Sequence, residues 1–172
     1  IETAMQIIDP TFQPIASLTQ APKLAVLDVN ADIAVLGCIQ KFFAQKGFVP
    51  KHVSVDSFEA AFQAGMQIIN YESWQAYGEL TETGLLGMDV QHRLLKAAET
   101  TVQQVEQAEH IRTKFIQEID HLFTEYDALL LPTLPQIPPK LIDAENTFAF
   151  LNLTALVRPF NLSGHPAISI PL

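Results

Sequence analysis

The segment from Lys23 to Val55 limits most strongly what this chain can fold into. A short apolar run, residues 24–27, has the composition of a strand that is covered on both faces of a parallel sheet. Apolar residues then recur at helical spacing over residues 32–46, and Gly47 suits the left-handed position that ends a helix. Extended character returns over residues 48–55. A strand, a helix and a second strand in this order predict a βαβ unit and therefore an α/β fold.

Helical spacing of apolar residues predicts several more helices. Pro10 ends the first of them, because proline disfavours helical geometry in the residue before it. Another begins at Asp56 or Ser57, whose side chains are suited to capping free N–H groups. Thr101 and Gln104 have the spacing of a capping box, which indicates the start of the longest helix. The expected helices cover residues 1–8, 32–46, 56–74, 89–98, 101–126 and 148–157.

Two further apolar runs, residues 127–131 and 168–172, are predicted to be strands. The proline-bearing residues 136–147 between them are expected to form a loop, and Arg158 to Pro166 a turn-dense segment. Together with the first two strands, these runs predict a mixed sheet with helices on its faces.

Composition excludes several classes of function. Nineteen acidic residues against ten basic ones give a net charge of −9, and a surface so negative repels phosphate groups. We therefore expect no binding to nucleic acid or to an anionic membrane. No apolar run approaches the roughly 18 residues that a membrane span requires. The single Cys38 excludes an internal disulfide, indicates a cytoplasmic location and is expected to be a buried structural thiol.

The two ends of the chain predict that it is a piece of a larger protein. It begins in a helical pattern without a methionine, and it stops in the apolar run 168–172. A sheet that is cut in this way exposes unpaired N–H and C=O groups along its edge. We therefore expect a homodimer formed through the sheet edge or through an apolar face.

Two segments that follow predicted strands or lead into them carry the main functional signal. The first reads Tyr126-Asp-Ala-Leu-Leu-Leu-Pro-Thr-Leu-Pro135, and the second reads Pro159-Phe-Asn-Leu-Ser-Gly-His-Pro-Ala-Ile-Ser-Ile-Pro171. Each joins a strand to turns that proline and glycine form, at the kind of sheet end where open α/β proteins bind ligands. Either one alone is more simply explained as an ordinary strand and turn, because fold does not imply function.

In this order the two segments resemble the closing region of the amidase-signature family of serine hydrolases. That family typically reads Y-D-x-L-L-x-P-T-x-P and then P-x-N-L-x-G-x-P-A-I-S-x-P, and this chain matches nearly every fixed position. The intervening pattern is also similar, so the resemblance covers essentially the whole chain. It implies that residues 1–172 are the C-terminal segment of a single amidase-signature domain and adopt part of that family's fold.

The resemblance implies an enzyme that hydrolyses the C–N bond of a carboxylic amide. Its family uses a serine nucleophile, a second serine in a cis peptide, and a lysine that accepts the proton. Those groups belong to an upstream signature, and this chain has no Gly-Gly-Ser-Ser run and no lysine beside a serine pair. We therefore expect no catalytic residue here, no activity of the chain by itself, and no cofactor or metal.

The resemblance also implies which residues bind the small-molecule amide substrate: Arg93, Thr154, Phe160 and Asn161. In glutamine-using members, an arginine at the position of Arg93 holds the substrate carboxylate, and an aspartate at the position of Thr154 pairs with its α-amino group. Threonine lacks that negative charge, which disfavours glutamine as the substrate and favours a general amidase. A surface arginine without a substrate role is an equally good interpretation of Arg93.

Other candidate residues have simpler interpretations. Ser163 and His165 are close together in the second segment, but we expect a turn, because His165 cannot easily fold back through Gly164 and the first glycine of a nucleophile elbow is missing. No two of the five histidines have the i, i+4 spacing of a metal site. A cluster of carboxylates is typical of the solvated end of a helix: Glu118, Asp120, Glu125 and Asp127.

Two alternatives to a general amidase stay open. One is a non-catalytic βαβ binding or interaction module that shares only turns with the family. The other is the A subunit of a glutamine-dependent tRNA amidotransferase. An upstream reading frame with a Gly-Ser-Ser-Gly stretch and a lysine would favour an enzyme over the binding module.

Overall fold

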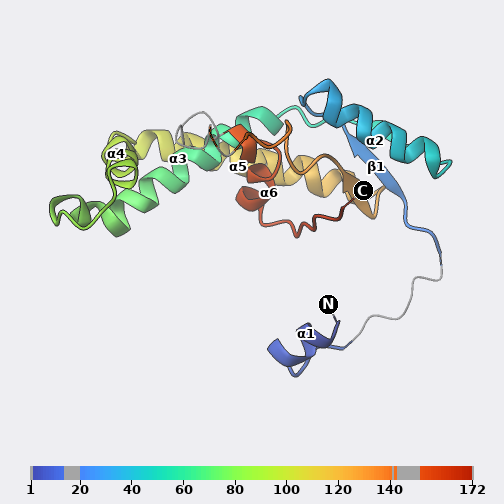
Figure 1. Ribbon diagram of the computed structural model, residues 1–172, viewed down its shortest axis with the longest axis horizontal. Coiled ribbons are helices and arrows are strands. Elements are labelled where there is room, and N and C mark those ends of the chain that lie inside the picture. The colour runs from blue at the N-terminus through green and yellow to red at the C-terminus, as the bar shows by residue number, and fades with distance from the viewer. Residues whose placement is uncertain (1, 14–19, 141, 143–151, 172) are drawn as a thin grey trace.

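The computed structural model describes residues 2–13, 20–140, 142 and 152–171 (Figure 1). Helices α3 and α5 are the two longest and pack against each other along the body, whereas α1 lies apart from it in Figure 1. The helices predicted before residue 126 are confirmed as α1 to α5. The elements are, in chain order, α1 (Glu2–Ile8), β1 (Leu24–Leu27), α2 (Ile33–Gln45), β2 (Lys51–Val53), α3 (Phe58–Tyr77), the 3-10 helix η1 (Gly78–Glu82), α4 (Met88–Ala97), α5 (Val102–Leu122), β3 (Ala128–Leu130) and α6 (Arg158–Ser163).

The sheet has the strand order β2-β1-β3, and both of its strand pairs are parallel. Ala25 of the central strand aligns with Lys51 on one side and with Leu129 on the other. Each connection between these strands contains helices, and a helical crossover returns the chain to the same end of the sheet. The α/β class is therefore confirmed. The expectation of a mixed sheet is wrong for the described residues, because all three strands run in one direction.

The predicted βαβ unit is confirmed as β1, α2 and β2. Helix α2 ends just before Gly47, whose φ of +64° is a left-handed conformation that glycine adopts without a Cβ clash. No residue of α2 is buried, and Cys38 on this helix is exposed. The expectation of a buried structural thiol is therefore wrong, because α2 lies at the surface and buries none of its residues.

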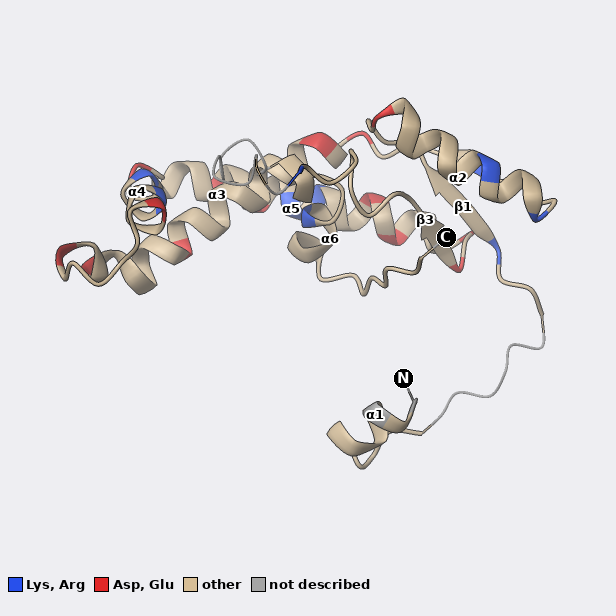
Figure 2. Cartoon of the chain, in the orientation of Figure 1, with Lys and Arg blue, Asp and Glu red and all other residues tan. Residues whose placement is uncertain are grey.

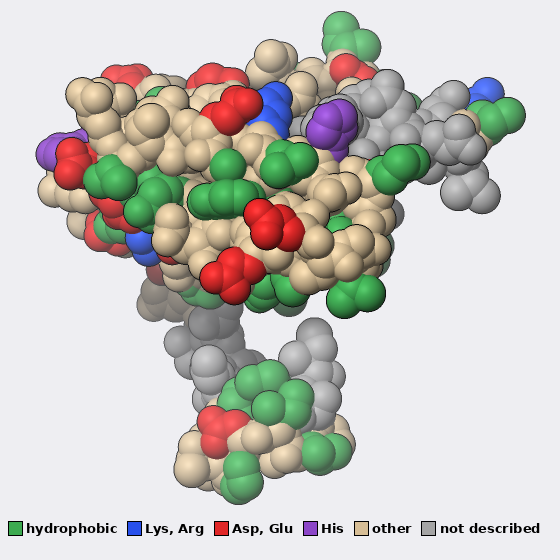
Figure 3. Space-filling model, turned by 90° about the vertical axis from the view of Figure 1, so that its left-hand side faces the viewer, with side chains coloured by type: hydrophobic (Ala, Val, Ile, Leu, Met, Phe, Trp, Pro, Cys, Tyr) green, Lys and Arg blue, Asp and Glu red, His purple; other side chains and the backbone are tan. Residues whose placement is uncertain are grey.

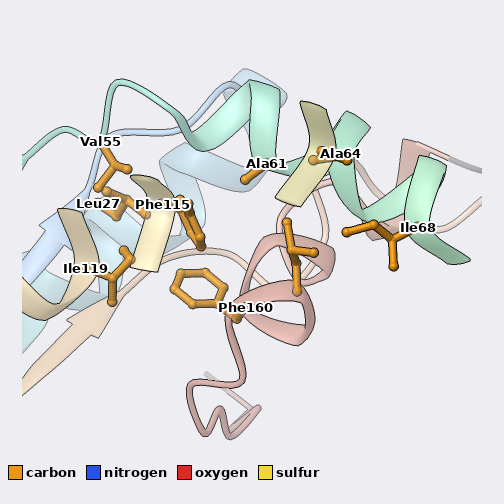
Figure 4. Packing of buried hydrophobic residues seen from close by; sticks show 10 residues of the cluster. Leu27, Val55, Ala61, Ala64, Ile68, Phe115, Ile119 and Phe160 are labelled. Atoms are coloured by element: carbon orange, nitrogen blue, oxygen red, sulfur yellow. The ribbon is translucent and has the colours of Figure 1, made fainter. Parts of the chain in front are cut away.

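The core lies where α3, α5 and α6 meet one face of the sheet (Figure 4). The rings of Phe58, Phe115 and Phe160 pack edge to face, and each pair of ring centroids is 6.0 Å apart. The core includes three fully buried alanines, Ala61 and Ala64 of α3 and Ala108 of α5, whose small side chains leave room for neighbouring helices. Because Phe160 joins this core, it fixes α6 and the second sequence segment to the body. The buried cluster comprises Leu27, Val55, Ala61, Ala64, Ile68, Ala108, Phe115, Ile119, Phe160 and Leu162.

Ser57 precedes α3, but its side chain does not cap the helix as predicted. Its hydroxyl donates to Glu118 Oε2 at 2.5 Å, and its backbone N–H donates to the same oxygen at 3.0 Å. Partial burial alone raises the pKa of Glu118, but the hydrogen bonds from Ser57 and the charge of Lys114 lower that pKa overall. Glu118 therefore ties the start of α3 to α5. The prediction of a solvated carboxylate is wrong for Glu118, although Asp120, Glu125 and Asp127 are exposed.

The C-terminal region differs most from the sequence prediction. Residues 158–163 form α6 rather than turns, and Pro159 is tolerated because the N–H groups of a first helical turn need no partner within the helix. Ile168 and Ile170 are 76% and 67% exposed, and residues 165–171 pair with no described strand. The predicted last strand is therefore wrong within the described residues, because no neighbouring strand supplies hydrogen bonds to it. Of the predicted helix 148–157, residues 148–151 lie outside the described residues, and residues 152–157 form 3-10 and other turns.

Apolar side chains are exposed on the end of the molecule that contains η1 and α4 (Figure 3). They include Leu80, Leu85, Met88 and Leu95. None of the helices in the described part of the chain is long and apolar enough to cross a membrane. A homodimer through an apolar face or the sheet edge stays a prediction, as does the cytoplasmic location.

The capping box at the start of α5 is confirmed, and it leads to a stability prediction. Thr101 Oγ1 accepts a hydrogen bond from the Gln104 N–H at 3.3 Å, and Gln104 Oε1 accepts one from the Thr101 N–H at 2.8 Å. We expect Thr101→Ala to lower the free energy of unfolding by about 1 kcal/mol, because N–H groups of the first turn lose their partners. Urea denaturation measures this loss. Thr101→Ser keeps the hydroxyl, and an equal loss in that variant would contradict the capping explanation.

Candidate functional site

The two sequence segments meet in one cavity beyond the carboxyl end of β3. Pro132 and Thr133 follow the strand directly, and Ser169 of the second segment lies beside them, with 2.7 Å between the hydroxyl oxygens of Thr133 and Ser169. The cavity has a volume of about 130 Å³, and we call it the motif pocket. Its lining consists of Leu131, Pro132, Thr133, Leu156, Val157, Phe160, Ala167, Ile168 and Ser169.

The chemistry of the motif pocket is mostly apolar, with one hydroxyl pair. Sites that enclose a whole small molecule are usually about 300–1,000 Å³, so a cavity of this size encloses only part of a ligand. Its place at the carboxyl end of a parallel strand is where open α/β folds bind their ligands. The described residues around it include no nucleophile paired with a base, which suits a wall of a site rather than its reactive centre.

Helix α6 separates the motif pocket from a second cavity of about 240 Å³, which we call the arginine pocket. Phe160 faces the core and the motif pocket, whereas Asn161 is exposed and lines the arginine pocket. The structure therefore does not bring these two predicted site residues to the same cavity. The arginine pocket is lined by Gly65, Ile68, Ile69, Glu72, Arg112, Arg158, Asn161 and Leu162.

Of the other two predicted residues, Thr154 contacts Arg158, whereas Arg93 acts on Arg158 only through its charge. Arg158 Nη2 donates a hydrogen bond to Thr154 Oγ1 at 3.0 Å. Burial lowers the pKa of Arg158, and the positive charge of Arg93 on α4 lowers that pKa further. Arg93 itself is exposed. The structure thus brings Arg93, Thr154 and Asn161 into the surroundings of one side chain that sequence reasoning missed.

Arg158 could have been noticed from its place in the sequence, since it follows Thr154 by four residues and directly precedes the second segment. Spacing alone does not show that a distant glycine makes room for it. A Cβ atom at Gly65 on α3 would lie 3.2 Å from Arg158 Cγ, so the absence of a side chain there lets α6 approach. This proximity arises only from the packing of α3 against α6.

Ser163 and His165 are in contact, which the sequence argument did not expect. Gly164 adopts a φ of +77°, and this turn folds His165 back so that its Nδ1 lies 2.8 Å from Ser163 Oγ. His165 Nε2 lies 3.1 Å from Asp120 Oδ1. The three side chains form a hydrogen-bonded series that joins the end of α6 to α5.

This series lacks what catalysis by Ser163 would need. The Ser163 hydroxyl also lies 3.2 Å from the Phe160 carbonyl oxygen, at the C-terminal end of α6. The partial negative charge at a helix C-terminus disfavours an alkoxide or an oxyanion at that place. We therefore interpret the series as a structural link. In the described part of the chain, no group of three His, Cys, Asp or Glu side chains could hold a metal ion.

Comparison with known proteins identifies the family. A family profile described as Amidase matches residues 32–172. The A subunit of the glutamyl-tRNA(Gln) amidotransferase from Archaeoglobus fulgidus is 26% identical over 113 residues, which are 63% of this chain and 25% of that protein. The corresponding protein of Thermotoga maritima is 33% identical over 61 residues, which are 36% of this chain and 13% of that protein. The matches thus span a quarter or less of the length of these curated relatives.

Solved structures confirm the fold. The crystal structure of an amidase matches with a TM-score of 0.78 at 16% identity, over 95% of this chain and 41% of that one. The A subunit of the Thermotoga maritima amidotransferase matches with a TM-score of 0.61 at 19% identity, over 83% of this chain and 33% of that one. The resemblance carried by the two sequence segments is therefore confirmed, and the chain belongs to the amidase family.

Proposed function

We propose that this chain is the C-terminal part of an amidase that hydrolyses a carboxylic amide C–N bond. The observation that carries the proposal is that the two family segments, more than twenty residues apart in sequence, converge on one cavity beyond the carboxyl end of β3. Family membership supports the reaction class. In this proposal the chain supplies one wall of the substrate site, and the reactive groups lie on a segment that precedes residue 1.

The proposed reaction proceeds through a serine, a second serine in a cis peptide and a lysine, all upstream. The nucleophilic serine attacks the amide carbonyl carbon while its proton passes through the second serine to the neutral lysine. Backbone N–H groups stabilise the oxyanion, the C–N bond breaks, and water then hydrolyses the acyl-enzyme. The contribution of this chain is to bind and orient the substrate, through the motif pocket and through Arg93, Thr154, Phe160 and Asn161.

A second candidate is the A subunit of a glutamine-dependent amidotransferase, which the names of the curated relatives favour. The residue that opposes it is Thr154, since the family's glutamine users have an aspartate there. Thr154 accepts a hydrogen bond from Arg158, and in this proposal the positive charge of Arg158 would lie beside the α-amino group of a glutamine substrate. Two positive charges repel each other, so we favour a general amidase over a glutaminase.

The experiment measures ammonia release from propionamide, benzamide and glutamine, with two proteins. One is the 172-residue chain, and the other is the same chain extended upstream through the serine-rich signature. We expect no release with the chain alone, and release from propionamide or benzamide with the extended protein. Hydrolysis by the chain alone would contradict the upstream location of the reactive groups, and activity on glutamine alone would favour the amidotransferase.

A further inference from the structure

One side of the motif pocket is formed by residues 165–171, which we call the wall segment and which few contacts hold in place. The wall segment contributes Ala167, Ile168 and Ser169 to the lining of the pocket. Residues 166–171 are exposed and form no described helix or strand. Within the described part of the chain, the hydrogen bonds of the wall segment are formed by His165 and Ser169 only. The position of this side of the pocket therefore depends on two anchors.

His165 anchors the start of the wall segment to α5. Its side chain is only 15% exposed, and its Nε2 lies 3.1 Å from Asp120 Oδ1. Its ring also packs against Phe123, with the two ring centroids 5.5 Å apart. Figure 2 shows acidic residues on the half of α5 that lies near the sheet. Among residues 164–171, His165 has the only side chain that can carry a positive charge, so it is the natural partner for this acidic helix.

The direction of the hydrogen bonds around His165 follows from what each group can donate. The Asp120 carboxylate only accepts, so Nε2 of His165 carries the hydrogen of that bond. In a neutral imidazole Nδ1 then accepts, and the Ser163 hydroxyl donates to it at 2.8 Å. The Phe160 carbonyl does not need this hydroxyl, because it accepts from the Gly164 N–H at 2.9 Å. Both ring nitrogens of His165 are thus engaged, which fixes the orientation of the ring.

We propose that His165 is a positioning residue for amide hydrolysis, because it ties the wall segment to α5 and thereby sets the shape of the motif pocket. His165 is not part of the pocket lining, so it acts through the wall and not on the substrate. Pro166 has a restricted φ and also restricts the backbone of His165, so a displaced ring moves the wall with it. The effect on hydrolysis rests on the proposed function, whereas the anchoring of the wall segment does not.

The anchoring is tested by ¹⁵N relaxation on the 172-residue chain. We expect backbone order parameters of about 0.8 for residues 167–169 in the native chain, and of about 0.6 or lower in Asp120→Ala. Asp120 is exposed and lies outside the pocket lining, so its truncation removes the anchor and leaves the lining intact. Glu106→Ala removes another exposed carboxylate of α5 and is expected to leave the order parameters unchanged. Native order in Asp120→Ala would overturn the proposal.

Two replacements of His165 separate its two hydrogen bonds. The amide nitrogen of glutamine reaches the place of Nε2 and can donate to Asp120, whereas the shorter asparagine reaches only Ser163. We therefore expect His165→Gln to keep most of the order of the wall segment and His165→Asn to lose it. Equal losses in the two variants would overturn the role of the bond to Asp120. The ring ¹⁵N chemical shifts of the native chain give a further check, because an Nδ1–H tautomer would place an unprotonated Nε2 against the carboxylate and contradict the proposed link.

The effect on the reaction is measured in the extended protein with propionamide and benzamide. We expect Asp120→Ala to raise KM about three- to tenfold and to change kcat by less than about twofold, because the wall binds substrate while the reactive groups lie upstream. His165→Gln is expected to keep KM near the native value. An unchanged KM in Asp120→Ala, or a loss confined to kcat, would overturn the positioning role. Absence of hydrolysis by the native extended protein would instead contradict the proposed function, and the order parameters decide the anchoring of the wall in either case.

Discussion

Replacement of Phe115 by alanine is expected to lower the free energy of unfolding by about 3–5 kcal/mol, the largest effect of any single substitution considered for this chain. Phe115 is 0% exposed and contacts both Phe58 and Phe160 of α6. The alanine variant loses the transfer free energy of the ring and leaves a cavity that α3, α5 and α6 cannot all close. Because domains of this size are typically stable by only about 5–15 kcal/mol, this loss is a large part of the total.

Urea denaturation followed by circular dichroism measures the Phe115→Ala effect, and Phe123→Ala is the matched control. Phe123 directly follows the same helix but is 39% exposed and, among the described residues, makes a ring contact only with His165, so its truncation is expected to cost about 1–2 kcal/mol, less than that of Phe115. Phe115→Ala should also broaden the NMR signals of α6, because Phe160 loses one of its two ring contacts. Equal losses in the two variants would show that the aromatic cluster does not hold α6 to the body.

The second large effect is expected at Glu118, which accepts both hydrogen bonds from Ser57. Ser57 is only 4% exposed, so Glu118→Ala leaves a buried N–H and a buried hydroxyl without their acceptor. We expect a loss of about 1–3 kcal/mol in the free energy of unfolding at neutral pH. Glu106→Ala, at an exposed position of the same helix, is expected to change it by less than about 0.5 kcal/mol.

The contribution of Glu118 to the free energy of unfolding is expected to decrease as the pH falls. Although partial burial raises the pKa of Glu118, the hydrogen bonds from Ser57 and the charge of Lys114 bring that pKa below its ordinary value of 4.5 in the folded state. A carboxyl group with a lowered pKa stabilises the fold fully above its unfolded pKa, and this contribution is lost as pH falls through the folded pKa. The stability difference between the native chain and Glu118→Ala is therefore expected to shrink below about pH 4.5. A stability difference between the two proteins that grows on acidification would contradict the stabilising role of the ionised Glu118 side chain.

Local patterns predicted the first two-thirds of the fold well. The helical spacing before Gly47 and the capping box at Thr101 depend on neighbouring residues only, and both features form as expected. Non-local contacts account for the errors. Ser57 has the right chemistry for a cap, but a carboxylate 61 positions away takes its hydroxyl. The composition of residues 158–166 is typical of turns, yet the burial of Phe160 against two other rings stabilises α6.

The candidate site was only partly predictable for the same reason. The two family segments indicated which residues to examine, and the motif pocket combines residues from both. Phe160 and Asn161 face different cavities because residues 158–163 form a helix, and the sequence prediction expected turns there. Arg158 was missed because its role depends on Gly65 and Phe62 of α3, almost a hundred positions earlier. The hydrogen-bonded series through His165 likewise requires the left-handed turn at Gly164.

The central proposal is that this chain binds the substrate while the nucleophilic serine lies upstream of it. The most direct test is to locate the reactive serine. The extended protein is treated with a fluorophosphonate, which forms a covalent adduct with an activated serine, and the adduct is mapped by peptide mass spectrometry. We predict an adduct on a serine that precedes residue 1 and none on residues 1–172. An adduct on Ser163, the serine that contacts His165, would contradict the account and place the nucleophile within this chain.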